Sequence, residues 1–332
     1  MEMRNTPAFQ FESAVDAVVS GDTTRLKALL AENPSLIRAR STRAHHAMLL
    51  HYIGTNGVEE ERQKYPPNAV EVLRILLDAG AEVDAEADMY GGGSTTLGLV
   101  ATSIHPSKAG MMVPLLEILL EAGAVIDHPK AAGNGQYAVN GCLHNGRPEA
   151  ADYLTRRGAR LDLEGAAGVG RLDTVATFFN DDGSLKATAT KKQMEYGYIW
   201  ACEFGHTVVI DYLMDRGLAP ATQVDGMNGL HWAVIGGHLD TIRRLIERKV
   251  PLEDRNMYGG TALGAAFWAA IRSEEVYRWP ERGDDIINIE TLLKAGAVIE
   301  PGTLQWLAGE KNMPAARKAA LDTLLRRYGA DS

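Results

Sequence analysis

The chain of 332 residues has only two cysteines and no uninterrupted apolar segment of the roughly 18 residues that a membrane span requires. Two cysteines do not form a disulfide framework. Basic residues (34) are fewer than acidic ones (43), so the overall field repels phosphate backbones. Residues 1–12 lack the basic and then apolar pattern of a secretory signal. We therefore expect a cytoplasmic protein without a nucleic-acid or membrane partner.

Motifs of metal, phosphate and nucleophile sites are also missing. The sequence contains no H-E-x-x-H, no C-x-x-C, no G-x-S-x-G and no G-x-x-x-x-G-K-[ST]. The glycine-rich run at 165–170 lacks the preceding strand and the spacing of a dinucleotide fold. We expect no metal and no cofactor, and these patterns do not decide whether the chain is an enzyme.

A short pattern, L-L-x-x-G-A, is repeated along the chain. It ends at Gly80-Ala81, Gly123-Ala124 and Gly296-Ala297. The copy that ends at Gly329-Ala330 has one extra residue before the glycine, and Lys249-Val250 replaces Gly-Ala in a degraded copy. The spacing from Gly296 to Gly329 is 33 residues. A period of this length indicates stacked helical units, because each unit exposes an apolar face that its neighbour buries.

The best-preserved unit, residues 225–252, reads DGMNGLHWAVIGGHLDTIRRLIERKVPL. It resembles the ankyrin repeat, with its turn, T-P-L-H-x-A-A, G-H and G-A elements. The resemblance implies an all-α solenoid of stacked helix-turn-helix units, forming one domain over 1–332. We expect nine units, including the caps: 9–41, 42–86, 87–128, 129–162, 163–190, 191–222, 223–254, 255–299 and 300–332.

Several side chains take structural positions in this alignment. Cys142 and Cys202 fall at small-residue positions of first helices and are expected to pack there. His51 and His231 occupy the Leu-His position and His206 and His238 the Gly-His position, so we expect them to hydrogen-bond turns.

Three units are longer than the repeat requires. The alignment places the extra residues between the two helices of a unit, at about 58–68, 104–112 and 270–285. Such insertions emerge on one face and often build a binding site.

The resemblance implies partner binding on the concave side, through hairpin tips and the ends of first helices. The leading hypothesis is a recognition module for a protein or peptide partner. The binding candidates come from these positions and from the third insertion: Thr55, Asn56, Thr102, Ser103, His144, Asn145, Glu203, Phe204, Trp268, Tyr277, Arg278 and Trp279.

The alternative hypothesis is an enzyme or a binder of a small polar or anionic molecule. Two similar turns, at 89–98 and 257–264, contain Tyr-Gly-Gly, and such glycines can present backbone N–H groups to an anion. An ordinary hairpin that enters its helix has the same pattern. Acid–base catalysis would require the ionisable candidates to face one cavity: His51, Tyr52, Glu59, Arg62, Tyr90, His105 and Tyr258.

Overall fold

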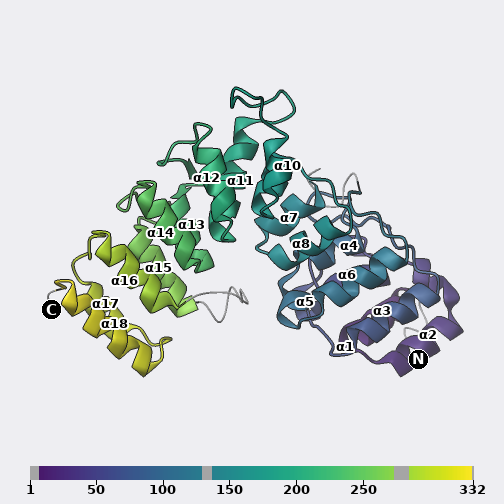
Figure 1. The fold of residues 1–332 in the computed structure, drawn as a ribbon. Coiled ribbons are helices and arrows are strands. Elements are labelled where there is room, and N and C mark those ends of the chain that lie inside the picture. The colour runs from purple at the N-terminus through teal and green to yellow at the C-terminus, as the bar shows by residue number, and fades with distance from the viewer. Residues whose placement is uncertain (1–6, 129–136, 273–283, 331–332) are drawn as a thin grey trace. The chain divides into compact units, whose positions relative to one another are not determined.

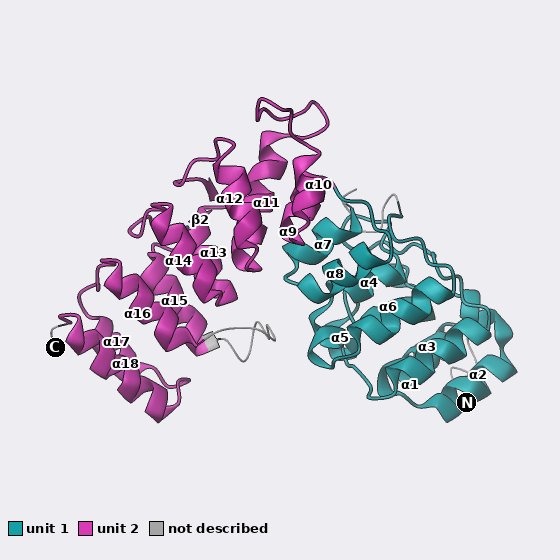
Figure 2. Cartoon of the chain, in the orientation of Figure 1, with its two compact units in different colours: residues 1–161 teal, residues 162–332 magenta. Residues whose placement is uncertain are grey.

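The computed structural model describes residues 7–128, 137–272 and 284–330. The chain divides into two compact units, residues 1–161 (unit 1) and residues 162–332 (unit 2), which Figure 2 distinguishes by colour. Each unit is described by itself, and a single domain over the whole chain stays a prediction. Each of the nine expected segments contains a pair of helices, here called its first and second helix, and the first three segments contain one short additional helix each.

Unit 1 contains four helix pairs in two layers (Figure 1). The first helices α1, η3, α4 and α7 pack in succession, and so do the second helices α2, α3, α6 and α8. The elements are α1 (Pro7–Ser20), α2 (Thr23–Glu32), η2 (Pro34–Arg38), η3 (Leu49–Gly54), η4 (Glu60–Arg62), α3 (Ala69–Asp78), α4 (Thr96–Thr102), α5 (Ile104–Lys108), α6 (Met112–Glu121), α7 (Ala138–His144) and α8 (Pro148–Arg156).

Unit 2 repeats this arrangement. Its first helices α9, α11, α13 and α15 pack side by side, and α10, α12, α14, α16 and α18 form the second layer. The elements are α9 (Leu163–Gly168), α10 (Leu172–Ala176), α11 (Lys191–Glu203), α12 (Thr207–Met214), β1 (Gln223–Val224), β2 (Met227–Asn228), α13 (Gly229–Gly236), α14 (Leu239–Glu247), α15 (Ala262–Arg272), α16 (Asp285–Lys294), α17 (Thr303–Gly309) and α18 (Ala315–Arg327).

The prediction of an all-α solenoid fold is confirmed. Strand pairing in the described ranges is limited to β1 with β2 and two isolated bridges. The hairpin turn between β1 and β2 is Asp225-Gly226, and both residues have positive φ, at 50° and 72°. That backbone matches the type I′ turn, which Asp-Gly favours.

The L-L-x-x-G-A pattern is the C-terminal cap of the second helices. At the end of α3, the Gly80 amide donates to the Leu77 carbonyl and the Ala81 amide donates to the Leu76 carbonyl. Gly80 has φ of 87°, the left-handed conformation that this cap requires. The same two bonds recur at the pattern ending in Gly296-Ala297, so the repeated sequence reflects a repeated backbone requirement.

Lys249 takes the glycine position of this cap after α14, with φ of 61°. A left-handed backbone costs a residue with a side chain roughly 1–2 kcal/mol. Glycine avoids this cost but loses more conformational entropy on folding, so the net gain from replacing Lys249 with glycine is smaller. We expect Lys249→Gly to raise the free energy of unfolding of unit 2 by about 0.5–1 kcal/mol. Urea titration followed by tryptophan fluorescence measures this, because all five tryptophans lie in unit 2.

Gly296→Ala is the matched control for this substitution. Gly296 has φ of 98°, and an added Cβ would meet no atom within 4 Å, so only the backbone conformation is penalised. We expect this variant to lose about 1 kcal/mol. A Lys249→Gly variant less stable than the wild type would contradict the assignment of strain to this cap.

Three of the four histidines assigned to the repeat, His51, His206 and His231, contact backbone groups, as expected. His51 Nε2 donates to the Ala85 carbonyl at 2.9 Å, and its Nδ1 accepts from the Met48 amide at 3.1 Å. His231 Nε2 contacts the Gly260 carbonyl at 3.2 Å, and His206 Nε2 contacts the Gly168 carbonyl at 3.1 Å. His206 and His231 therefore bond backbone of a neighbouring repeat, and His51 bonds backbone at the end of its own segment, 42–86.

The core consists of the apolar faces between the helices. Cys142 and Cys202 are fully buried free thiols, which confirms their expected packing role. Trp200 is buried as well, and its ring meets the Trp232 ring edge-on with centroids 5.6 Å apart. In the described ranges, no helix is both long enough and apolar enough to cross a membrane.

Candidate functional site

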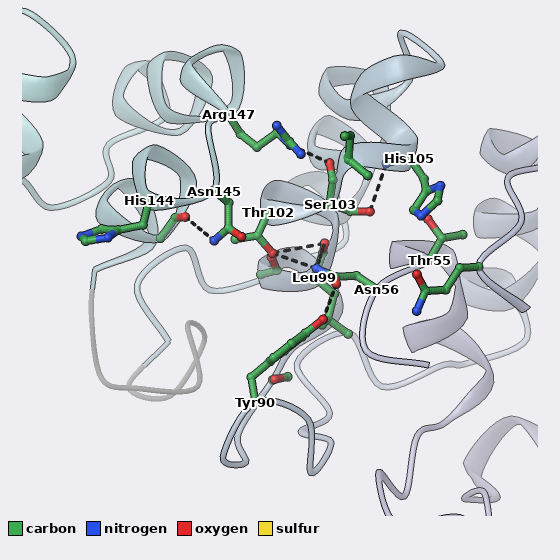
Figure 3. A pocket seen from close by; sticks show the side chains of 15 residues that line it. Thr55, Asn56, Tyr90, Leu99, Thr102, Ser103, His105, His144, Asn145 and Arg147 are labelled. Carbon is green, nitrogen blue, oxygen red and sulfur yellow. Dashed lines mark hydrogen bonds between the residues drawn. The ribbon is translucent and has the colours of Figure 1, made fainter. Parts of the chain in front are cut away.

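A pocket of about 520 Å³ lies in unit 1, at the ends of three successive first helices (Figure 3). Residues that follow η3 line it together with the C-terminal ends of α4 and α7. The turn before α4, the helix α5 and the start of α8 also contribute. The lining residues are Thr55, Asn56, Gln63, Tyr90, Ser94, Gly98, Leu99, Thr102, Ser103, Ile104, His105, Gly141, His144, Asn145 and Arg147.

Asn56 joins two repeats across the pocket. Its Nδ2 donates to Thr102 Oγ1 at 3.2 Å, and its Oδ1 accepts from the Tyr90 hydroxyl at 2.5 Å. Thr102 Oγ1 itself donates to the Gly98 carbonyl at 2.8 Å, so it is free to accept from Asn56. This chain of bonds fixes the Asn56 amide and holds the Tyr90 ring against the pocket (Figure 3).

Two lining residues have left-handed backbone, Thr55 with φ of 45° and Tyr90 with φ of 51°. Positive φ is a true outlier for the β-branched Thr55. The Thr55 hydroxyl donates to the Gly54 carbonyl at 2.8 Å, and its side chain is buried. Such outliers gather at functional sites, where the surrounding structure holds them.

Ser103 positions the basic end of the pocket. Its carbonyl accepts from Arg147 Nε at 3.1 Å, and its hydroxyl accepts from the His105 amide at 3.3 Å as the N-cap of α5. Arg147 Nη1 also donates to the Gly146 carbonyl at 2.7 Å. Burial lowers the pKa of His105, and the charges of Lys108 and Arg147 lower it further. Arg147 and His105 therefore lie close enough to influence each other.

Eight of the residues nominated from the sequence line this one pocket. They are the binding candidates Thr55, Asn56, Thr102, Ser103, His144 and Asn145, with Tyr90 and His105 from the acid–base set.

Sequence reasoning missed three polar lining residues, Gln63, Ser94 and Arg147. Arg147 follows the nominated pair His144-Asn145 after a single glycine, and this adjacency is the signal that could have identified it. Gln63 lies in the first insertion, and its amide donates to the Val58 carbonyl at 2.8 Å.

The other acid–base candidates do not line this pocket, so the structure does not bring the whole set together there. His51 is fully buried, and burial lowers its pKa to about 4, so it is neutral. Tyr52 is buried beside it, and burial followed by the charge of Glu59 raises its pKa. Tyr258 is 84% exposed in a turn of unit 2.

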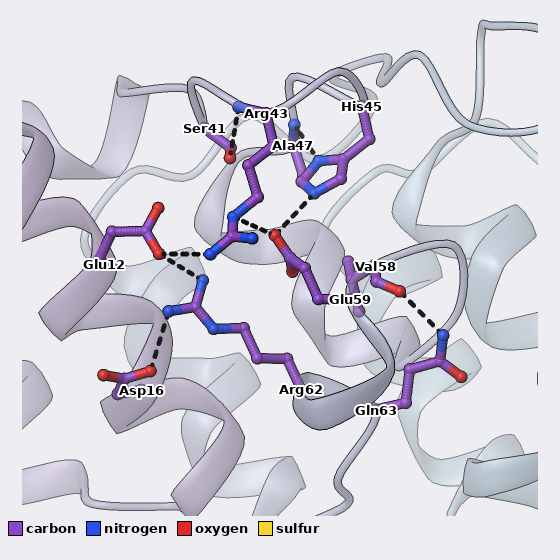
Figure 4. Close-up of polar contacts among 10 residues, drawn as sticks. All are labelled: Glu12, Asp16, Ser41, Arg43, His45, Ala47, Val58, Glu59, Arg62 and Gln63. Carbon is purple, nitrogen blue, oxygen red and sulfur yellow. Dashed lines mark hydrogen bonds and ion pairs between the residues drawn. The ribbon is translucent and has the colours of Figure 1, made fainter.

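Arg62 anchors the first insertion to the first helix of the chain (Figure 4). Its Nη1 lies 2.6 Å from Glu12 and its Nη2 lies 3.1 Å from Asp16, both on α1. The Arg62 side chain is only 11% exposed. It therefore acts as a buried tie between the η4 segment and α1.

Glu59 completes this ion network (Figure 4). Its Oε1 pairs with Arg43 and lies 3.2 Å from His45 Nε2. The Ala47 amide donates to His45 Nδ1, so Nε2 carries the proton that bonds Glu59. Burial alone would raise the pKa of Glu59, but a backbone hydrogen bond, His45 and Arg43 together lower it. Glu59 is therefore an ionised group that pairs with Arg43 and His45 within the structure, and it does not line the pocket.

The remaining binding candidates belong to unit 2. Glu203 ends α11 and is only 3% exposed, so its carboxyl does not lie on an open concave surface. Phe204 is half-buried and stacks with Trp200, and Trp268 is 40% exposed. Tyr277, Arg278 and Trp279 lie outside the described residues.

The two Tyr-Gly-Gly turns differ in their surroundings. In the second turn, the amides of Tyr258 and Gly260 both donate to Asn256 Oδ1, at 3.0 and 2.9 Å. These donors are used within the turn, so the anion site considered for that turn is wrong. The first turn contributes to the pocket through the Tyr90 side chain instead.

The fold and the repeated caps define a class of protein, the helical repeat solenoids. A family model described as "Ankyrin repeats (3 copies)" matches residues 198–279, so the chain contains ankyrin repeats, in agreement with the resemblance seen in the sequence. Ankyrin repeats are typical of protein-interaction modules, whose stacked repeats form extended concave binding surfaces.

Two other similarities place this chain beside known proteins. It is 26% identical over 171 residues to the palmitoyltransferase AKR1 of Debaryomyces hansenii. The aligned region covers 42% of this chain and 21% of that protein. The chain thus spans about a fifth of that relative. The crystal structure of the human ASB11 ankyrin repeat domain matches over 89% of this chain and 100% of that domain, with 17% identity and a TM-score of 0.41.

Proposed function

We propose that this protein is a recognition module that binds an extended segment of a partner protein on the concave side of its repeats. The unit 1 pocket receives one side chain or terminus of that segment. The observation that carries the proposal is the convergence of Thr55-Asn56, Thr102-Ser103 and His144-Asn145 on one pocket. These pairs end three consecutive first helices, where the repeat presents a continuous row of contact positions.

The polar character of the pocket supports recognition of a peptide. Its amides, hydroxyls and imidazoles can donate to or accept from a peptide backbone. The Asn56 bridge orders the wall before any partner arrives, which lowers the entropy cost of binding. His144 and Asn145 are exposed at the rim, where a longer segment can continue along the surface.

A second candidate function is the binding of a small polar or anionic molecule. The volume of about 520 Å³ favours it, because ligand pockets commonly range from roughly 300 to 1,000 Å³. The ionisable Tyr90 and His105 lie in the lining. Native mass spectrometry of the purified chain distinguishes this candidate by the mass of a bound compound.

Site-specific photo-crosslinking in the cells of origin tests the proposed function. A benzophenone amino acid replaces Asn145 at the rim in one variant and Glu117, exposed on the second helix α6, in the matched control. We expect the rim variant to yield a protein adduct at least tenfold more abundant than the control. The same adduct should weaken when Asn56→Ala removes the bridge across the pocket. Equal adducts from both positions would exclude the concave site.

A further inference from the structure

Tyr90 is an exposed aromatic residue whose hydroxyl is held and whose ring is uncovered. The hydroxyl donates to Asn56 Oδ1 at 2.5 Å, yet the residue is 62% exposed (Figure 3). Within residues 7–128, 137–272 and 284–330, no aromatic ring and no cation packs against the Tyr90 ring. A tyrosine fixed at its polar tip offers a flat apolar surface at little cost in entropy, which is the character of an aromatic anchor in an interface.

The backbone of the first Tyr-Gly-Gly turn places its tyrosine differently from the second. Tyr90 has φ of 51°, whereas in the second turn the left-handed residue is Gly259, with φ of 82°. Tyr258 is 84% exposed, and no group in the described ranges bonds its hydroxyl. Only the turn that lines the pocket therefore holds its tyrosine in the left-handed conformation, which is unfavourable for a residue with a side chain.

Two amide side chains of the lining can donate to a bound segment. The Gln63 amide donates to the Val58 carbonyl at 2.8 Å, and the Asn145 amide donates to the Gly141 carbonyl at 2.9 Å. An amide nitrogen carries two hydrogens, and no other acceptor in the described part of the chain takes the second one of either residue. These neutral donors suit backbone carbonyls that make no hydrogen bonds of their own.

The stacking of the repeats matches the period of a polyproline II helix. That helix has three residues per turn and a rise of about 3.1 Å, so one turn advances by about 9 Å. Packed helices lie roughly 8–10 Å apart, and the pocket spans the ends of η3, α4 and α7, which pack in succession. A segment in this conformation would turn the same face to each repeat. Its carbonyls make no internal hydrogen bonds, so they are open to the amide donors.

We infer that the segment bound by unit 1 is a polyproline II helix and that one of its prolines stacks on the Tyr90 ring. This inference rests on the proposed recognition function and specifies the conformation and the anchor residue of the partner segment. Proline suits the site because its rigid apolar ring has almost no side-chain entropy to lose, and aromatic-lined grooves recognise such helices.

Titration of the full chain with octaproline tests the inference, with an octapeptide of alternating glycine and serine as the control probe. Nuclear magnetic resonance follows the tyrosine ring signals, and a Tyr90→Phe variant assigns the Tyr90 signal. We expect octaproline to shift this signal saturably and the tyrosine ring current to move proline ring protons upfield. The control peptide should do neither. Absence of a saturable Tyr90 shift with octaproline would overturn the inference.

Substitutions at Tyr90 identify the ring as the anchor. We expect Tyr90→Ala to weaken octaproline binding at least tenfold and Tyr90→Phe, which keeps the ring, to stay within about threefold. Tyr258→Ala removes the exposed tyrosine of the other turn and should leave affinity within about twofold. Tyr90 is exposed, so the unfolding midpoint of Tyr90→Ala should match that of the wild type. Equal affinity for Tyr90→Ala and wild type would reject Tyr90 as the anchor.

Competition with the photo-crosslinked adduct separates failure of this inference from failure of the proposed function. Octaproline added to lysate before irradiation should reduce the adduct of the rim variant at least threefold. An adduct that octaproline does not reduce would leave partner recognition in place and reject the polyproline segment. Saturable Tyr90 shifts without any adduct would support the proline site and reject partner recognition in the cells of origin.

Discussion

Gly236→Ala is expected to destabilise unit 2 by about 3 kcal/mol or more. Gly236 ends α13, and an added Cβ would lie 1.9 Å from the Glu203 carbonyl oxygen of α11 and 2.9 Å from its carbonyl carbon. These atoms are backbone, so no side-chain rotation relieves the overlap and the two helices must move apart. Overpacking that forces backbone shifts costs typically 1–3 kcal/mol, and more where the contact cannot yield. The repeats at this point therefore require a residue without a side chain.

Urea unfolding followed by tryptophan fluorescence measures this effect on unit 2, which contains all five tryptophans. Gly264→Ala is the matched control, because Gly264 is also helical, in α15, and its added Cβ would meet only Thr261 Oγ1 at 4.0 Å. We expect the control to gain up to about 1 kcal/mol from the higher helix propensity of alanine. Equal midpoints for Gly236→Ala and wild type would show that α11 and α13 do not approach as closely as described.

Glu203→Gln is expected to stabilise unit 2 by an amount that grows with pH. Burial of the carboxyl raises its pKa from 4.5 to about 8, so the folded chain keeps it protonated at neutral pH. Below pH 4.5 both the folded and the unfolded states hold this proton, and no penalty exists. Between about pH 4.5 and 8 the unfolded state releases the proton while the folded state retains it, so the stability of the wild type falls as pH rises.

Glutamine has nearly the shape of protonated glutamate and does not titrate. The difference in free energy of unfolding between variant and wild type should therefore be small near pH 4, rise steadily, and level off at about 5 kcal/mol above pH 8. Urea titrations at pH values from 4 to 9 measure it.

Glu195→Gln is the control on the same helix. Glu195 pairs with Lys191 at the surface of α11, so its loss should change stability by less than about 1 kcal/mol. A pH-independent effect of Glu203→Gln would show that the Glu203 carboxyl reaches water.

Glu203 and Gly236 show that the end of a first helix can serve packing between repeats instead of partner binding. Glu203 was nominated as a concave binding residue because it ends a first helix. The structure buries it, since α13 approaches the end of α11 so closely that Gly236 meets the Glu203 backbone. The equivalent ends of η3, α4 and α7 in unit 1 leave room for a pocket instead. Helix-end position alone therefore does not decide whether a side chain is available to a partner.

The composition of the candidate site was predictable only in part. Helix-end positions identified six lining residues, because the repeat fixes where every first helix stops. Arg147 was missed, since its place in the lining depends on a turn that brings the start of α8 beside Ser103. Glu59 and Arg62 look like catalytic groups in the sequence, yet Arg43 and the acidic residues of α1 pair with them. Those partners are 16 to 50 residues away along the chain, and no local pattern records them.

The sequence by itself determined the repeat, its helix pairs and their caps. These features depend on short-range chemistry: glycine where φ must be positive, histidine where a turn carbonyl must be bonded, and leucine on the faces that stack. Tertiary structure decided which helix ends remain open and which are buried. Those outcomes depend on the spacing between neighbouring repeats, which is set by the summed packing of many side chains that lie far apart in the chain.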